Sequence, residues 1–344
     1  MRAASPTVSV LMPVRNAVAT VEQAVQSVLN QTHPDLELVL VDDGSRDGST
    51  ALLRAIARRD RRVQLIETVP RGIVSALCAA VERASAPCFA RMDADDWCHP
   101  DRLRRQLAHL GRRPEVGAVG CLTHSCADGG WGRYQRWLNG CRTWRQIARD
   151  LLVESPLAHP SVLMRRRAYV QAGGYQELDG PEDYDLWLRM VRAGWRLGKV
   201  GSVLLDWRDS PRRLTRTDPR YRPEAFIRLK ARHLALVQLA HDPRPIWIWG
   251  AGRHGRLLCR ALEPLVPAAR IQAFVDIDPN KIGRQRRSRP VLSPAALRTP
   301  TEDHESTPDV LVLVAVPVAG ARALIRRRLT RLGYLEARDY WCCA

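Results

Sequence analysis

Three aspartates fall within four positions of RMDADDW, residues 91–97, directly after the apolar residues CFA. Neighbouring carboxylates repel one another, and each raises the pKa of the next. A divalent cation between them would remove that cost, because Mg²⁺ and Mn²⁺ prefer carboxylate oxygens as ligands. The alternative is a turn at the end of a strand, in which solvated acids precede or cap a helix. This stretch alone leaves both interpretations open.

Two further acidic stretches could bind or react. VDDGS places Asp42 and Asp43 at the end of an apolar run, where a carboxylate could accept hydrogen bonds from a base or from ribose hydroxyls. The alternative there is an Asx turn with the following glycine. In EDYDLWLR, Asp183 could take the proton from a hydroxyl nucleophile. Its alternative role is a helix cap, since Asp is favoured just before an apolar helical face.

A glycine pattern in the C-terminal part of the chain is typical of a nucleotide site. Gly250, Gly252 and Gly255 follow the apolar run IWIW and precede a helical pattern, and Asp276 ends the next apolar run. This context predicts a Rossmann-like turn that could bind NAD(P) or another nucleotide. The alternative is a fold kept for packing or oligomerisation. No Tyr-x-x-x-Lys pair follows, which argues against a second activity.

Strand and helix patterns alternate along the chain and must position these groups. Short apolar runs, each followed by helical periodicity, predict an α/β fold with a mainly parallel sheet and helices on both faces. Ligands bind such sheets at the carboxyl ends of strands, so VDDGS and MDADD should converge on one edge. From residue 245 a second alternation predicts a smaller doubly wound domain. We therefore expect domains at 1–222 and 244–344, joined by a helical connector at 223–243.

Composition narrows the class of protein. The 344 residues carry a net charge of +18, yet only three of the 54 basic residues are lysines and the arginines are spread along the chain. Nucleic-acid binding is therefore not expected, whereas peripheral attachment to an anionic membrane surface is compatible with this charge. No signal-peptide pattern or long apolar span is present, and the nine cysteines lack metal-finger spacing. These features favour the cytoplasm, with the inner face of the cell membrane as one location.

Six short motifs together resemble glycosyltransferase family 2. They are PVRN (13–16), VDDGSRDGST (41–50), RMDADDWCHPDRL (91–103), HPSVLMRR (159–166), GGY (173–175) and EDYDLWLR (182–189). They occur in the order of the family and cover roughly residues 5 to 210. The resemblance implies a GT-A fold and transfer of a sugar from a nucleotide diphosphate, UDP in the first instance, to a hydroxyl.

The resemblance also assigns roles to residues of this chain. It implies that Asp95 binds Mg²⁺ or Mn²⁺, that Asp93 contacts ribose or the metal, and that Asp96 is either a further ligand or structural. The remaining residues implied at the nucleotide-sugar site are Pro13, Val14, Asn16, Asp42, Asp43 and Arg71. Cys78 departs from the pattern, because relatives often have Asn there.

For the transfer step the resemblance implies Asp183 as the catalytic base, with inversion at the anomeric carbon. Glu182 and His159 are implied near the acceptor, which would be a polysaccharide, a lipid-linked glycan or a small molecule. Two rival functions remain at this stage. One is an NAD(P)-linked sugar oxidoreductase or epimerase built on the glycine pattern, and the other is a non-catalytic nucleotide-binding protein.

Overall fold

The computed structural model describes residues 6–126, 129–209, 213–297 and 308–344. The chain divides into two compact units. The first comprises Met1–Ile147 and Ser155–Thr217, and the second comprises Ala148–Glu154 and Asp218–Ala344.

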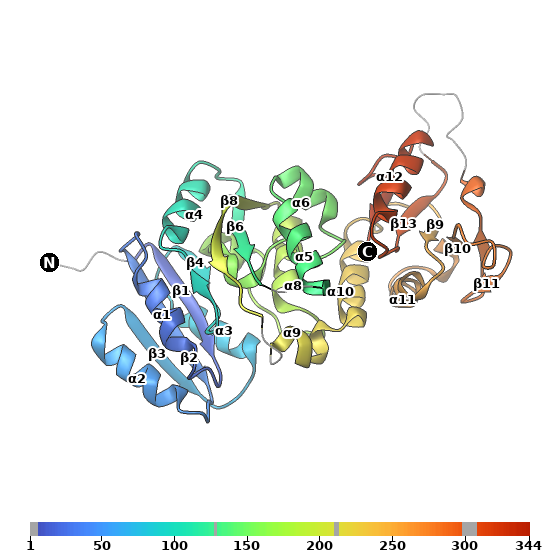
Figure 1. Ribbon diagram of the computed structural model, residues 1–344. Coiled ribbons are helices and arrows are strands. Elements are labelled where there is room, and N and C mark those ends of the chain that lie inside the picture. The colour runs from blue at the N-terminus through green and yellow to red at the C-terminus, as the bar shows by residue number, and fades with distance from the viewer. Residues whose placement is uncertain (1–5, 127–128, 210–212, 298–307) are drawn as a thin grey trace. The chain divides into compact units, whose positions relative to one another are not determined.

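The first unit is built on an eight-stranded sheet with the order β3-β2-β1-β4-β7-β6-β8-β5 (Figure 1). Its strands are β1 (Val8–Val14), β2 (Leu36–Asp43), β3 (Val63–Thr68), β4 (Cys88–Arg91), β5 (Trp97–Cys98), β6 (Val116–His124), β7 (Leu163–Arg165) and β8 (Arg196–Asp206). Strands β3, β2, β1 and β4 run parallel, whereas β7 and β5 are antiparallel to their neighbours. The expected α/β fold with a mainly parallel sheet is confirmed.

Helices connect these strands in the expected alternation. They are α1 (Val21–Leu29), α2 (Ser49–Arg59), α3 (Ile73–Arg83), α4 (Arg102–Gly111), α5 (Gly129–Gly140), α6 (Trp144–Asp150), α7 (Arg166–Gln171), α8 (Glu182–Arg192) and α9 (Leu214–Thr217). No helix within the described ranges is both long enough and apolar enough to cross a membrane.

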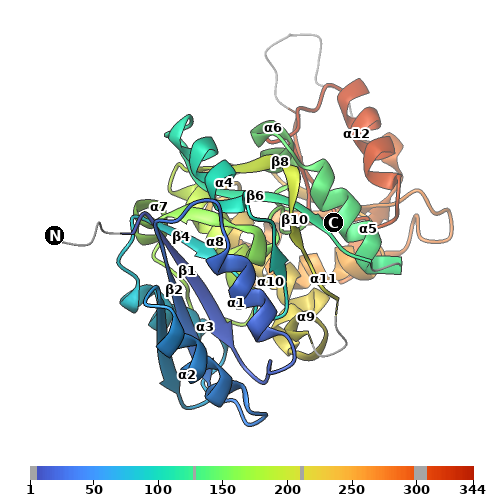
Figure 2. The same ribbon diagram turned by 60° about the vertical axis from the view of Figure 1, so that its left-hand side comes forward.

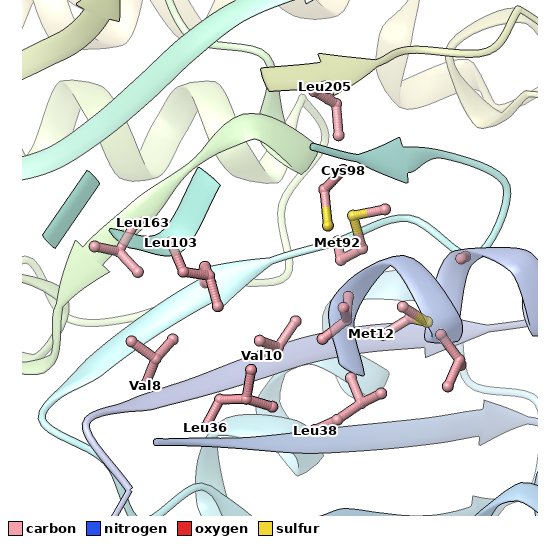
Figure 3. Packing of buried hydrophobic residues seen from close by; sticks show 14 of the residues in the cluster. Val8, Val10, Met12, Leu36, Leu38, Met92, Cys98, Leu103, Leu163 and Leu205 are labelled. Atoms are coloured by element: carbon pink, nitrogen blue, oxygen red, sulfur yellow. The ribbon is translucent and has the colours of Figure 1, made fainter. Parts of the chain in front are cut away.

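The core of the first unit fixes where β1 and β2 end. Both strands are almost fully buried, because helices cover both faces of a parallel sheet. Figure 3 shows Val10 and Met12 of β1 beside Leu38 of β2 in this core. Helix α1, which Figure 2 shows alongside β1, adds Val21 and Val25 from its apolar stripe. Each such side chain contributes roughly 1.5–3 kcal/mol when buried, so the strand ends are firmly held.

The second unit has its own sheet, with the order β11-β12-β10-β9-β13-β14. Its strands are β9 (Ile246–Trp249), β10 (Ile271–Val275), β11 (Gln285–Arg286), β12 (Arg289–Leu292), β13 (Leu311–Val314) and β14 (Tyr340–Cys342). All pairs are parallel except β11 with β12. The helices are α10 (Pro223–Leu236), α11 (Arg253–Leu262) and α12 (Ala321–Arg331).

A short earlier segment, residues 148–154, completes the second unit. Asp150 forms an ion pair with Arg326 at 2.5 Å, and Lys230 on α10 donates to the backbone oxygen of Val153 at 2.5 Å. Helix α10 also packs against α11. The structure thus groups the expected connector with the second unit, while the independence of the two units stays a prediction.

Candidate active site

Strands β1 and β2 end side by side, with Val14 opposite Asp42. The loops that follow them are tied together, since the side-chain oxygen of Asn16 accepts from the backbone N–H of Arg46 at 2.8 Å. Asn16 has a φ of 50°, a left-handed conformation that Asn tolerates better than most residues. The structure therefore brings Pro13, Val14, Asn16 and Asp42 to one edge of the sheet.

The two aspartates of VDDGS organise this edge. Asp42 accepts from the backbone N–H of Ser45, three residues on, at 3.0 Å, whereas an Asx turn bonds the residue two positions on. Asp43 accepts from the N–H groups of Arg71 and Gly72 at 2.7 and 3.0 Å, which holds the start of α3 against the end of β2. An ionised carboxylate has about four acceptor positions, so each aspartate retains capacity for a ligand donor.

Three carboxylates gather just beyond the end of β4. One oxygen from each of Asp93, Asp95 and Asp96 can be chosen so that all three lie within 4.8 Å of one another. Asp96 is buried, and its Oδ1 accepts from the backbone N–H of Arg208 at 2.9 Å. Its other oxygen is buried and has no hydrogen-bond partner within the described ranges. A hard cation bound by the three aspartates would fit this set of oxygen donors.

Two arginines that the sequence did not single out flank the cluster. The buried Arg91 forms an ion pair with Asp93, and Nη2 of Arg213 lies 3.8 Å from Oδ2 of the same residue. The guanidinium of Arg213 also sits over the rings of Trp131 and Trp207, at 5.1 and 5.0 Å from their centroids. Because arginines are spread along the whole chain, neither position carried a signal.

The surroundings of the three aspartates shift their pKa values in different directions. Burial raises the pKa of Asp93, but the charges of Arg91 and Arg213 outweigh it, so that pKa lies below its ordinary value. The pKa of Asp95 is raised by burial and then by the charge of Asp93, and that of Asp96 is raised further by the same causes together with Asp95. When all three acids are ionised, they carry one more negative charge than Arg91 and Arg213 neutralise, and a bound cation would favour that ionised form.

Behind the acids lies a hydrogen-bonded group of His159, Tyr175 and Glu182. Nε2 of His159 is 2.8 Å from the Tyr175 hydroxyl, and Nδ1 is 3.5 Å from Oε1 of Glu182. Burial and then the charge of Arg91 lower the pKa of His159, against the opposing effect of Glu182. Both His159 and Glu182 are buried, so they support the wall of the site more than they face solvent.

Helix α8 presents three acids in its first turn, and they differ in exposure. Glu182 and Asp185 are buried, and Asp185 forms an ion pair with Arg189 at 2.6 Å. Asp183 is half-buried and accepts from the N–H of Tyr184 at 2.7 Å. The helix N-cap is Pro181, one residue before the helix, so Asp183 does not occupy the cap position.

The sequence around these residues is similar to that of known proteins. Residues 9–173 match the model for glycosyl transferase family 2. Over 188 residues the chain is 33% identical to the amylovoran biosynthesis glycosyltransferase AmsE of Erwinia amylovora. The matched region covers 54% of this chain and 68% of that protein.

The chain belongs to glycosyltransferase family 2.

Other family comparisons support this assignment. The glycosyltransferase EpsE of Bacillus subtilis, whose assignment is provisional, is 29% identical over 198 residues, 56% of this chain and 69% of that protein. The crystal structure of S. aureus TarS 1–349 in complex with UDP-GlcNAc superposes with a TM-score of 0.53 at 14% identity, covering 74% of this chain and 71% of that one. That likeness confirms the expected GT-A fold.

The second unit of this family 2 glycosyltransferase holds the glycine pattern. Gly250 has a φ of 115°, and a Cβ at Gly255 would lie 1.7 Å from the backbone oxygen of Gly250. Asp276 accepts from the N–H of Ala251 at 2.9 Å and pairs with Lys281 at 3.2 Å. These contacts account for both glycines and for the aspartate through packing alone.

Nothing lies within 4 Å of a Cβ built on Gly252, so packing does not require that third glycine. A nucleotide at this turn stays a prediction.

Proposed function

We propose that this glycosyltransferase moves a sugar from a nucleotide-diphosphate donor, UDP-linked, to a hydroxyl acceptor in a metal-dependent, inverting reaction. The observation that carries the proposal is the convergence of Asp93, Asp95 and Asp96 at the end of β4, within the family 2 domain. Asp42 and Asp43 lie at the end of β2, on the same edge of a sheet whose strands β2, β1 and β4 run parallel. That arrangement suits a ligand with a base at one end and a diphosphate at the other.

The residues present fit Mg²⁺ or Mn²⁺. All three candidate ligands are carboxylates, and the buried Oδ2 of Asp96 lacks a partner in the described part of the chain. Among the described residues, arginine side chains form ion pairs with Asp93 but not with Asp95. We assign Asp95 as the ligand and Asp93 as the residue that bridges toward ribose or the metal. When bound, the metal would supply positive charge to the departing diphosphate.

Asp183 is the proposed base. Its carboxylate accepts the proton of the acceptor hydroxyl while that oxygen bonds to the anomeric carbon and the bond from this carbon to the diphosphate breaks. One displacement on one carbon inverts its configuration. Asp183 lies next to Glu182 in the first turn of α8, and Oε1 of Glu182 is 3.5 Å from Nδ1 of His159. Val162, three residues after His159, accepts from the backbone N–H of Arg91, which shortly precedes the acid cluster, at 2.9 Å. These contacts support placing the base beside the acid cluster.

Names among the relatives suggest the acceptor class. AmsE is named for amylovoran biosynthesis, and chondroitin synthase of Pasteurella multocida is 27% identical over 190 residues, although those cover only 19% of that protein. A growing polysaccharide is therefore the proposed acceptor, ahead of a lipid-linked glycan or a small molecule.

The test is calorimetric titration of UDP-sugars and GDP-sugars with and without Mn²⁺. We expect Asp95→Asn to abolish metal-dependent donor binding while the protein still melts cooperatively. Asp35→Asn is the matched control, because Asp35 is exposed and precedes β2, outside the site. Equal donor affinity in wild type and Asp95→Asn, or equal affinity with and without metal, would remove the metal from the proposal.

A further inference from the structure

An open cleft of about 570 Å³ lies between α4 and β8 of the first unit. Nine residues line it, none of them acidic, and the basic ones are Arg104, Arg105, His109, Arg112, Arg113 and Lys199. The spacing of four residues places Arg104 and Ala108, and likewise Arg105 and His109, on one face of α4, and Arg112 and Arg113 follow its last residue, Gly111.

The charges in the cleft are only partly balanced. Asp101 contacts Arg104 at 2.9 Å and Arg105 at 3.6 Å. Arg112 and Arg113 are both exposed, and their side chains form no ion pair or hydrogen bond with any residue that the structure describes. Lys199 contributes only its stem, because its ammonium donates to the backbone oxygens of Leu138 and Pro156. The surplus positive charge therefore belongs to the arginines.

The helix dipole of α4 accounts for the arginines at its C-terminal end but not for those in its first turn. Basic residues near the C-terminus of a helix interact favourably with its dipole, which suits Arg112 and Arg113. The first turn of a helix disfavours positive charge, yet Arg104 and Arg105 lie there. Arg104 and Arg105 on the helix and Arg112 and Arg113 just beyond its end also repel one another. A bound anion would relieve both effects.

The cleft is separate from the acid cluster. Strands β4 and β6 are both antiparallel to β7, so they run in the same direction. The aspartates follow the end of β4, whereas Arg112 and Arg113 precede the start of β6 at Val116. The aspartates and the two arginines therefore lie at opposite ends of the strands of this sheet.

We propose that the cleft between α4 and β8 binds a phosphate group, through Arg112 and Arg113 with Arg104 and Arg105. Arginine guanidinium groups match phosphate oxygens in charge and geometry. Phosphate of this kind is carried by the headgroups of anionic lipids and by soluble phosphate compounds. The site is independent of the donor site and does not rest on the proposed reaction.

The test compares the full chain with two double variants of equal charge. Arg112→Gln/Arg113→Gln removes the unpaired arginines of the cleft. Arg58→Gln/Arg59→Gln is the control, because these arginines are likewise exposed, adjacent and at the C-terminal end of a helix, α2. One arm measures co-sedimentation with vesicles of phosphatidylcholine, alone or mixed with phosphatidylglycerol. The other arm titrates inorganic phosphate by calorimetry.

We expect the cleft variant to bind phosphatidylglycerol vesicles or inorganic phosphate roughly 30-fold more weakly than wild type. The control should stay close to wild type. If the cleft variant loses only vesicle binding, the bound phosphate group belongs to a lipid headgroup. If it loses binding in both arms, the cleft also binds soluble phosphate. Ala108→Glu, which puts a carboxylate at the centre of the cleft, should have the same effect. Equal weakening of both double variants, or no binding by the wild type in either arm, would overturn the proposal.

Discussion

At the scale of single residues, the acids of the α8 first turn show how exposure separates roles. Glu182 and Asp185 are buried, and Asp185 is held by Arg189, whereas Asp183 reaches the surface. We predict that Asp183→Asn still binds donor but loses transfer by about 100-fold or more, the usual scale for a positioned general base. Turnover with a proven acceptor and donor titration are the two measurements. Turnover within a few-fold of wild type would leave Asp183 with a structural role only.

Lys199 carries a second prediction at this scale. Burial lowers its pKa from 10.5 to about 8, so below pH 8 the folded protein holds a charge that burial disfavours. The unfolded state then binds more protons than the folded state between pH 8 and 10.5, and stability rises there by up to about 1.4 kcal/mol per pH unit. We expect the melting temperature of wild type, relative to that of Lys199→Met, to increase from pH 7.5 to pH 9.5 in calorimetry.

Lys281 provides the control for that measurement. Its partners Asp276 and Asp278 outweigh burial and raise its pKa, so the proton stays on in both states over this pH range. Lys281→Met should therefore differ from wild type by a constant amount between the two pH values. A constant difference for Lys199→Met as well would contradict the prediction.

At the scale of elements, sequence patterns predicted most strands and the acid cluster, since both depend on neighbours along the chain. The run CFARMD predicted the strand β4 and the acids after it. Helix α5 was not predicted, because its glycines and tryptophans show no clear helical stripe. The strongest disagreement is at TWRQIARDLLVES, whose periodicity predicts one long helix. Helix α6 ends at Asp150, and the residues after it join the second unit.

Partners from distant elements were beyond prediction. Arg213 is far from Asp93 in the sequence, yet its guanidinium contacts Asp93 and sits over the rings of Trp131 and Trp207. No local pattern records such a contact, and the abundance of arginine hides it. Likewise Asp183 is more exposed than Glu182 because of how α8 packs, and the local sequence does not show that packing.

The turn between β9 and α11 offers a matched pair of glycine variants. A Cβ at Gly255 would overlap the backbone oxygen of Gly250, so α11 would have to move away from β9. We predict that Gly255→Ala destabilises the second unit by about 3 kcal/mol or more, as severe overpacking does. Gly252→Ala should change stability by less than about 0.5 kcal/mol, because nothing lies within 4 Å and its φ is −77°. Urea unfolding followed by circular dichroism distinguishes the two.

At the scale of the whole molecule, we predict that a chain ending at residue 243 keeps donor binding but melts at a lower temperature. This chain retains the family 2 domain and α10. It lacks Arg326, the partner of Asp150, and Cys343, whose backbone oxygen accepts from the buried Lys230 at 3.3 Å. Asp150 keeps Arg149 at 2.8 Å and Lys230 keeps the backbone oxygen of Val153 at 2.5 Å, so each buried group loses one of its two partners, which lowers stability.

Calorimetry and nucleotide-sugar titration of the shortened chain provide the measurement, with the full chain as reference. If the shortened chain melts without cooperativity, the two units share one core and the boundary is wrong. Donor binding without transfer would instead show that the second unit contributes to the acceptor site.

The interleaving of residues 148–154 with the second unit has a consequence for biosynthesis. This segment leaves the ribosome early, but Arg326 and Cys343 are made near the end of translation. At usual elongation rates the delay is roughly 10 to 40 s. During that interval Asp150 has Arg149 beside it but lacks Arg326, and Lys230 lacks the backbone oxygen of Cys343. The second unit therefore completes its contacts with this segment only late in translation, and a chaperone that binds the segment in the interval would be detected by ribosome profiling of chaperone contacts.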